Sequence, residues 1–212
     1  MADHVALITG ASSGIGWELA KLFAKGGARL ALVARSTDRL EALAKEIVAE
    51  HPAAAPPLVI DCDLSRPDAG DVISAALKAA DVEVEYLVNN AGYGLLGDAI
   101  ALDRADQLAM IDLNVRALTD LSLRFADQLV RHKGGLLNVA SVAAFMPGPR
   151  MAVYYATKAY VLSLTEALQS ELAPRGVRVS ALCPGPVRTG FQKRAGVASE
   201  LNAGMVVSVE DV

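Results

Sequence analysis

Tyr154 and Lys158 stand four residues apart in the run Tyr154-Tyr155-Ala156-Thr157-Lys158. On a helix this spacing places two side chains on one face, about one turn apart. A lysine ammonium favours the phenolate form of a nearby tyrosine, so we expect the Tyr154 pKa to lie below its usual value of roughly 10. A tyrosine tuned in this way can donate or accept a proton near neutral pH. Because Tyr-x-x-x-Lys is also common on ordinary surface helices, the prediction needs support from the rest of the chain.

A glycine-rich segment near the N-terminus provides that support, because it is typical of a nucleotide site. Residues 4–8 are mostly apolar and predict a buried parallel strand, while residues 17–24 predict a helix. Residues 9–16 between them read Thr-Gly-Ala-Ser-Ser-Gly-Ile-Gly. Glycines let the backbone approach a pyrophosphate, and the helix N-terminus offers free N–H groups and a partial positive charge. The alternative is a glycine turn without a ligand, but the flanking strand and helix weigh against it.

Short apolar runs alternate with longer amphipathic stretches along the whole chain. Strands are predicted near residues 5–9, 28–34, 57–61, 84–88, 135–140 and 177–183. Helices are predicted near residues 14–26, 37–50, 67–80, 103–132 and 152–173. This alternation indicates an α/β protein of the doubly wound Rossmann type, with a parallel sheet of six visible strands and helices on both faces. We expect residues 1–212 to form a single domain.

Five local motifs, in this order, make the chain resemble the short-chain dehydrogenase/reductase family. They are the glycine turn of residues 9–16, the Asn-Asn-Ala-Gly run of residues 89–92, Asn114 in a predicted helix, Ser141 with Tyr154 and Lys158 after it, and the Pro-Gly segment of residues 184–189. No motif is specific alone, but the set is, and the resemblance covers essentially the whole chain. It implies an oxidoreductase that transfers a hydride between a nicotinamide cofactor and a carbonyl or alcohol.

The resemblance implies a role for each predicted catalytic residue. Tyr154 would donate a proton to the substrate carbonyl oxygen, or remove it in the oxidative direction. Ser141 would hydrogen-bond the same oxygen and stabilise its developing charge. Lys158 would hold the nicotinamide ribose and lower the pKa of Tyr154, while Asn114 would interrupt its helix and hold a water that passes protons to Lys158. Tyr155 lies three residues from Lys158 and is the alternative to Tyr154, but the spacing of the family favours Tyr154.

The resemblance also implies which residues contact the cofactor. They are Gly10, Ser12, Ser13, Gly14, Ile15, Gly16, Asp63, Leu64, Asn90, Ala91, Gly92, Tyr154, Lys158, Pro184, Gly185, Val187 and Thr189. Asp63, after the third predicted strand, is expected to reach the adenine, with Asp61 as the alternative.

The residues after the second predicted strand favour NADP(H) over NAD(H). NAD enzymes place an Asp or Glu about 20 residues after the glycine turn, where it accepts hydrogen bonds from the ribose. Here Ala34 takes that position and Arg35 follows it, and a guanidinium can hold a 2′-phosphate through paired hydrogen bonds. Arg39, one turn into the next helix, is expected to assist. Asp38 is the rival ribose acceptor, but we expect it to serve the helix N-terminus beside Ser36.

Composition and charge weigh against several other classes of protein. The 212 residues carry a net charge of −4, whereas nucleic-acid binding proteins usually present a basic face. No apolar run approaches the roughly 18 residues that a membrane span needs, and residues 1–4 lack the start of a signal peptide. We therefore expect a cytoplasmic protein without a nucleic-acid or membrane partner. Cys62, Cys183 and the three histidines show no metal-ligand spacing, so no metal site is predicted.

Two segments are expected to line the substrate pocket, residues 143–147 and a lid formed by the loop of residues 185–208. Their apolar side chains favour a medium-sized apolar ketone or aldehyde, with a β-ketoacyl thioester or a hydroxysteroid as alternatives. The other interpretation is that these side chains only pack against the sheet. A catalytically inactive dinucleotide-binding regulator or scaffold is a different class of function, and the presence of all four predicted catalytic residues weighs against it.

The helices predicted at residues 103–132 and 152–173 carry more apolar surface than one face of a sheet needs. The family pairs these two helices across a two-fold axis, so we expect a homodimer, with a homotetramer as the alternative. The end of the chain is unusual for the family, because residues 208–212 predict a helix that starts and stops at once. We expect the physical protein to continue beyond Val212 with a seventh strand.

Overall fold

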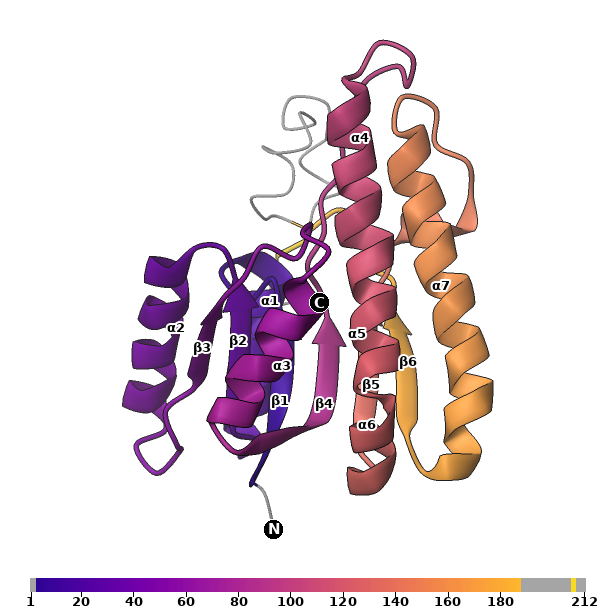
Figure 1. Ribbon diagram of the computed structural model, residues 1–212. Helices are drawn as coiled ribbons and strands as arrows, with labels where there is room; N and C mark the ends of the chain where they lie inside the picture. Colours follow the sequence, from indigo (N-terminus) through magenta and orange to yellow (C-terminus); the bar gives the residue numbers. More distant parts are fainter. Residues whose placement is uncertain (1–2, 188–206, 209–212) are drawn as a thin grey trace.

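The computed structural model describes residues 3–187 and 207–208, which are built around one parallel sheet (Figure 1). The strands are β1 (Asp3–Thr9), β2 (Leu30–Ala34), β3 (Leu58–Asp61), β4 (Val82–Asn89), β5 (Gly135–Val139) and β6 (Arg178–Leu182). Their order in the sheet is β3-β2-β1-β4-β5-β6, and every neighbouring pair is parallel. This is the strand order of the doubly wound α/β fold, so the predicted fold class is confirmed.

Helices cover both faces of this sheet. They are α1 (Gly14–Lys25), α2 (Thr37–Glu50), α3 (Ala69–Ala79), α4 (Arg104–Ile111), α5 (Leu118–Arg124), α6 (Ala126–His132) and α7 (Ala152–Leu172), with short 3₁₀ turns η2 (Val142–Phe145) and η3 (Ala173–Arg175). α1 and α2 pack on one face, while α3, the column of α4 to α6, and α7 lie side by side on the other (Figure 1). No helix within the described residues is long and apolar enough to cross a membrane.

The side chains of β1 alternate between the two faces of the sheet. Ala6 and Ile8 belong to the cluster packed with α1 and α2, whereas Val5 and Leu7 belong to the cluster packed with α3, α5 and α7. All four side chains are at most 1% exposed. A strand covered on both faces is apolar at successive positions, which explains why the sequence here shows a continuous apolar run instead of an alternating one.

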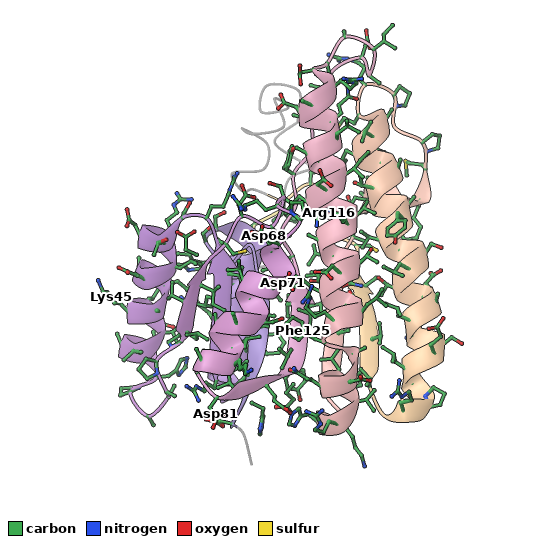
Figure 2. The ribbon with its side chains drawn as sticks, viewed as in Figure 1. Lys45, Asp68, Asp71, Asp81, Arg116 and Phe125 are labelled. Atoms are coloured by element: carbon green, nitrogen blue, oxygen red, sulfur yellow. The ribbon has the colours of Figure 1, made fainter. Side chains whose placement is uncertain are left out.

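The helix predicted for residues 103–132 is interrupted at Asn114, as the resemblance implied, and again at Phe125, where no break was predicted. α4 passes into a π-helical segment, η1 (Asp112–Ala117), which is followed by α5 and α6. Asn114 in η1 directs its side-chain amide to the backbone of Tyr93, a long-range contact that sequence periodicity does not encode. Phe125, labelled in Figure 2, separates α5 from α6 with φ −97° and ψ 1°, and its side chain is buried in the core.

Two arginines hold this column against α3 and the loop that precedes it, and Figure 2 labels Arg116 together with Asp71 of α3. Arg124 of α5 pairs with Asp71 of α3, with 2.7 Å between Nη1 and Oδ1. Arg116 of η1 donates from Nη2 to the carbonyl of Ser65 at 2.8 Å and pairs through Nε with Asp112 at 3.0 Å. The loop after β3 is therefore fixed to the π-helical segment.

Several predictions for the C-terminal part fall outside the described residues. They concern Thr189, most of the loop of residues 185–208, and the helix start at residues 208–212. Where the chain is described, Val187 and Val207 form an isolated parallel bridge, and the Val207 N–H donates to the Pro186 carbonyl at 3.1 Å.

Candidate active site

A cavity of about 710 Å³ lies at the carboxyl ends of the strands, lined by residues from the loops that follow all six of them. In open α/β sheets this is the edge at which ligands bind. The predicted residues that line the cavity are Gly10, Ser12, Ser13, Gly14, Ile15, Arg35, Arg39, Asp63, Leu64, Asn90, Ala91, Gly92, Ser141, Tyr154, Lys158, Pro184, Gly185 and Val187. Gly16 and Asn114 do not line it. The topology thus brings the separate sequence motifs to one place.

Glycines in the turn between β1 and α1 allow the close approach that a phosphate group needs. Gly10 and Gly14 have φ of +65° and +58°, a left-handed conformation that glycine adopts without strain. A Cβ on Gly16 would lie 2.4 Å from Asn90 Nδ2 and 2.5 Å from the Gly10 carbonyl oxygen. Ser13, the N-cap of α1, makes no side-chain cap bond to a described residue, and the first turn contains no acid. This helix end is therefore suited to an anion.

Asn90 and Thr9 join this glycine turn to the turn after β4. Asn90 Nδ2 donates to the carbonyls of Thr9 at 2.9 Å and Gly10 at 3.2 Å. The Thr9 hydroxyl accepts from the N–H groups of Asn90 at 3.0 Å and Ala91 at 3.1 Å. Asn90, predicted to contact the cofactor, thus uses its amide hydrogens to hold the two turns together. Thr9 opens the glycine motif but has no role in the sequence-based prediction. In the structure its hydroxyl is the acceptor shared by the N–H groups of Asn90 and Ala91.

Arg35 and Asp63 lie at one end of the cavity, after β2 and β3. Arg35 Nη1 is 4.0 Å from Asp63 Oδ2, and the guanidinium is largely exposed. Burial raises the Asp63 pKa, but hydrogen bonds from the Ser65 hydroxyl (2.7 Å) and N–H (3.0 Å), with the Arg35 charge, leave that pKa below its ordinary value. Arg39 lines the same end. The rival Asp38 is exposed in the first turn of α2 and does not line the cavity.

Ser141 and Tyr154 are hydrogen-bonded at the other end of the cavity. Ser141 is the N-cap of η2, and its Oγ accepts from the Ala143 N–H at 3.1 Å, which fixes the hydroxyl in place. Tyr154 is only 9% exposed, and this burial raises the pKa of its hydroxyl, although the hydrogen bond with Ser141 acts in the opposite direction. The prediction that Lys158 lowers this pKa is therefore wrong, because burial outweighs the neighbouring polar groups.

Lys158 is buried one turn after Tyr154, on the same helix. Its Nζ donates to the Val139 carbonyl at 2.7 Å and lies 6.0 Å from the centroid of the Tyr154 ring. Burial lowers the pKa of Lys158 to about 8, because the ammonium group loses its hydration. Tyr155 also lines the cavity, with its ring edge-on to that of Tyr154 and 6.0 Å between centroids. Of the two tyrosines, Tyr154 is the more deeply buried.

Asn114 connects the loop after β4 to α7 from behind the cavity wall. Its Oδ1 accepts from the Tyr93 N–H at 3.1 Å, and its Nδ2 donates to the Tyr93 carbonyl at 2.9 Å and to Thr157 Oγ1 at 3.1 Å. A Cβ on Gly92 would lie 3.0 Å from Asn114 Oδ1 and 3.6 Å from Lys158 Nζ. A side chain at residue 92 would therefore contact both polar atoms, and glycine leaves that position open.

Several residues that line the cavity near Tyr154 are missing from the sequence-based prediction. They include Tyr93, Asp106, Ala109, Leu113 and Met151, and also Val139, Ala140 and Val142 beside Ser141. Residues 106, 109 and 113 follow helical spacing, so they lie on one face of the α4–η1 column. That spacing is a signal which the sequence contains, but only the fold shows which face of the helix meets the cavity.

The segment after β5 contributes less to the cavity than predicted. Of residues 143–147, only Ala143 lines it. Phe145 and Met146 are 63% and 58% exposed and do not line the cavity. The reason is the η2 turn, which buries Ala143 and carries the next residues outward.

Within residues 3–187 and 207–208, no group of three His, Cys, Asp or Glu side chains is placed to hold a metal ion. Cys62 and Cys183 are free cysteines. Burial raises the pKa of the Cys62 thiol, as expected for a packed cysteine that takes no part in chemistry.

Comparison with known proteins shows to which family this chain belongs. Residues 4–199 match the family profile described as short chain dehydrogenase. The chain is 37% identical over 188 residues to serine 3-dehydrogenase from Agrobacterium fabrum, which covers 87% of this chain and 72% of that protein.

Solved structures agree with this match. A short-chain dehydrogenase from Sphingobium yanoikuyae in complex with NADPH is 37% identical, with a TM-score of 0.88 over 98% of this chain and 80% of that one. The bulky-bulky ketone specific alcohol dehydrogenase from Comamonas testosteroni is 32% identical, with a TM-score of 0.83 over 99% of this chain and 79% of that one. The family profile, the sequence identities and the shared fold lead to one assignment: this chain belongs to the short-chain dehydrogenase family of oxidoreductases.

Proposed function

We propose that this protein is an NADP(H)-dependent oxidoreductase that interconverts a carbonyl group and an alcohol, with Tyr154 as proton donor and acceptor. One observation carries the proposal: Ser141, Tyr154 and Lys158 line one end of the cavity that has the glycine turn and Arg35 at its other end. A dinucleotide held along this cavity would reach from the basic end to the three polar side chains.

The residues of the cavity fit a dinucleotide that carries a 2′-phosphate. Arg35 and Arg39 line the cavity, and Ala34 stands where a carboxylate would repel the phosphate. Arg35 Nη1 lies 4.0 Å from Asp63 Oδ2, which is too long for a hydrogen bond. The guanidinium is therefore available for paired hydrogen bonds to phosphate. The NADPH complex of the Sphingobium relative supports the same cofactor here. When bound, the cofactor would supply the hydride for reduction or receive it in oxidation.

Tyr154 and Ser141 would act together on the substrate oxygen. Because burial raises the pKa of Tyr154, its hydroxyl stays protonated at neutral pH and can donate as the oxygen gains negative charge. Ser141 Oγ accepts from the Ala143 N–H, so its own hydrogen can be donated to the same oxygen. The two hydroxyls are already adjacent, so little rearrangement is needed when a carbonyl binds between them.

Lys158 and Asn114 would resupply the proton that Tyr154 donates. Both hydrogens of Asn114 Nδ2 are engaged by protein acceptors, so Oδ1 is the atom that can accept from a water. Oδ1 and Lys158 Nζ both approach Gly92, which leaves room for that water. With a pKa of about 8, Lys158 can release and regain a proton near neutral pH, as a relay requires.

The walls around the reacting group favour a carbonyl compound of medium size whose central part is apolar. They include Leu113, Ala143 and Met151, beside the ring of Tyr93. The likeness to an alcohol dehydrogenase described as specific for bulky-bulky ketones supports a substrate of this kind. A β-ketoacyl thioester and a hydroxysteroid are the alternatives.

Matched tyrosine variants test the proposal in an NADPH oxidation assay over a panel of ketones and aldehydes. Tyr154→Phe should lower kcat/KM by about 10³-fold, the size of a general acid contribution. Tyr155→Phe should retain most of the activity, and both variants should bind NADPH like the wild type in a fluorescence titration. A greater loss in Tyr155→Phe than in Tyr154→Phe would contradict the site. Tight NADPH binding without turnover of any carbonyl would favour the inactive regulator or scaffold.

We also propose a homodimer that pairs α4, α5 and α7 with the same helices of a second copy. These helices lie side by side at one edge of the molecule (Figure 1) and leave apolar side chains exposed, with Leu108 at 53% and Tyr160 at 40%. The Tyr160 hydroxyl lies 3.0 Å from Thr119 Oγ1, so the two helices present one joint surface. Light scattering at micromolar concentration should give twice the mass of the chain, and a monomeric mass would refute the pairing.

A further inference from the structure

A carboxylate at the reaction end of the cavity takes no part in the chemistry described above. Asp106 of α4 lines the cavity together with Ala109 and Leu113. Its N–H donates to the Asp103 carboxylate at 3.0 Å, and its carbonyl accepts from the Tyr93 hydroxyl at 3.0 Å. These bonds fix the backbone of Asp106, whereas its carboxylate forms no ion pair or hydrogen bond with any residue in the described part of the chain.

The position of Asp106 relative to the reacting group follows from the helix that carries it. Met110 is 1% exposed and packs in one cluster with Ala143 and Tyr154. Asp106 precedes Met110 by four residues, which is one helical turn or roughly 5 Å along the axis. A carbonyl held at the Tyr154 hydroxyl would therefore have the Asp106 carboxylate within the length of a short spacer.

Among the described residues that line this end of the cavity, the charged side chains are Asp106 and Lys158. Among the described residues that line the cavity, Arg35 and Arg39 lie at the opposite end. Lys158 is buried and donates to the Val139 carbonyl. Tyr93, Ala109, Leu113 and Met151, which line this end with Asp106, are apolar or neutral, and the nearby Asp103 carboxylate adds negative charge. A carboxylate at the rim of an apolar pocket attracts cationic ligands and repels anionic ones.

We propose that Asp106 determines substrate specificity by receiving the ammonium group of an amino-substituted ketone or aldehyde, an inference that rests on the proposed function. The substrate carries its carbonyl and its ammonium group on either side of a short apolar spacer. Tyr93, Leu113 and Met151 enclose that spacer. Asp106 transfers no proton, so its effect is on substrate binding.

Three ketones of similar shape and different charge test this assignment: para-(aminomethyl)acetophenone, para-ethylacetophenone and para-acetylbenzoate. They are assayed with NADPH and the wild type, Asp106→Asn and Asp127→Asn. Asp127 is the matched control, since its side chain is 87% exposed on α6 at the far end of the column (Figure 1). Asp106→Asn should raise KM for the ammonium ketone about fivefold, lower it for the anionic ketone, and leave the neutral ketone and all kcat values unchanged. Asp127→Asn should change none of these values.

Equal changes for all three ketones in Asp106→Asn would show a structural role and overturn the proposal, as would a wild type that does not prefer the ammonium ketone. Saturation-transfer NMR on the NADP-loaded protein gives the affinity order without turnover. Binding in the expected order, sensitive to Asp106→Asn but without turnover of any ketone, would contradict the proposed function and leave the binding role of Asp106 supported.

Discussion

The two ends of the cavity are built from different parts of the chain and by different means. At the cofactor end, residues 9–16 form one continuous segment in which backbone geometry and the absence of side chains matter most. At the reaction end, the four residues come from η1, the turn after β5, and α7, and are placed by buried hydrogen bonds; they are Asn114, Ser141, Tyr154 and Lys158. Volume therefore governs the first end, whereas solvation and charge govern the second.

The largest effect is expected from adding volume at the cofactor end. Gly16→Ala places a Cβ 2.5 Å from the Gly10 carbonyl oxygen and 2.4 Å from Asn90 Nδ2, so the backbone must shift. We expect the free energy of unfolding, measured with urea, to fall by about 3 kcal/mol. Gly185→Ala is the matched control, because no atom of the described residues lies within 4 Å of its Cβ position, and it should leave stability unchanged. Similar losses in both variants would remove volume as the governing factor.

A smaller effect, dependent on pH, is expected at the reaction end. Lys158 has a pKa of about 8 in the folded protein and its ordinary value of about 10.5 when unfolded. Between these values the unfolded chain holds the proton that the folded protein has released, so raising the pH stabilises the folded state. The free energy of unfolding of the wild type should therefore rise relative to Lys158→Met, on the order of 2 kcal/mol from pH 8 to 10. A pH-independent difference between the two proteins would contradict the buried, depressed lysine.

The smallest effect is expected where the cofactor end does use a charge. Arg35→Ser removes the exposed guanidinium at the end of β2, and kcat/KM with NADPH should fall about tenfold, as for the loss of a charged hydrogen bond. Activity with NADH should not fall. Arg66→Ser is the control, since Arg66 is similarly exposed but pairs with Asp68 and does not line the cavity. A loss with both cofactors would assign Arg35 to folding instead of phosphate selection.

The same comparison explains what could be predicted from the sequence. The glycine turn is local, so its strand, its helix and its role in the fold follow from a few neighbouring residues. The sheet also follows, because apolar runs such as residues 4–8 reflect burial on both faces. The depth of burial of Tyr154 could not be predicted, since it depends on helices and loops distant in sequence, and it reverses the expected direction of the pKa shift.

Asn114 and Asp106 show a second limit. The motif marks Asn114, but the π-helical geometry around it depends on hydrogen bonds to Tyr93 and Thr157, which are not neighbours in the sequence. Asp106 has a clear helical spacing with Leu113, yet nothing in the sequence shows that this face meets the cavity.

The π-helical segment η1 has a consequence for changes in the length of the chain between α4 and α5. A π-helical turn holds one more residue than an α-helical turn does. η1 therefore sets the rotation of α4 about the helix axis relative to α5. Deleting one residue from it would let a regular α-helix run through, and α4 would rotate by about 100° relative to α5. The face with Asp106, Ala109 and Leu113 would then turn away from the cavity while the sheet stayed intact. A change of a single residue in length could thus replace one wall of the pocket at once, a route to new specificity that point substitutions do not offer.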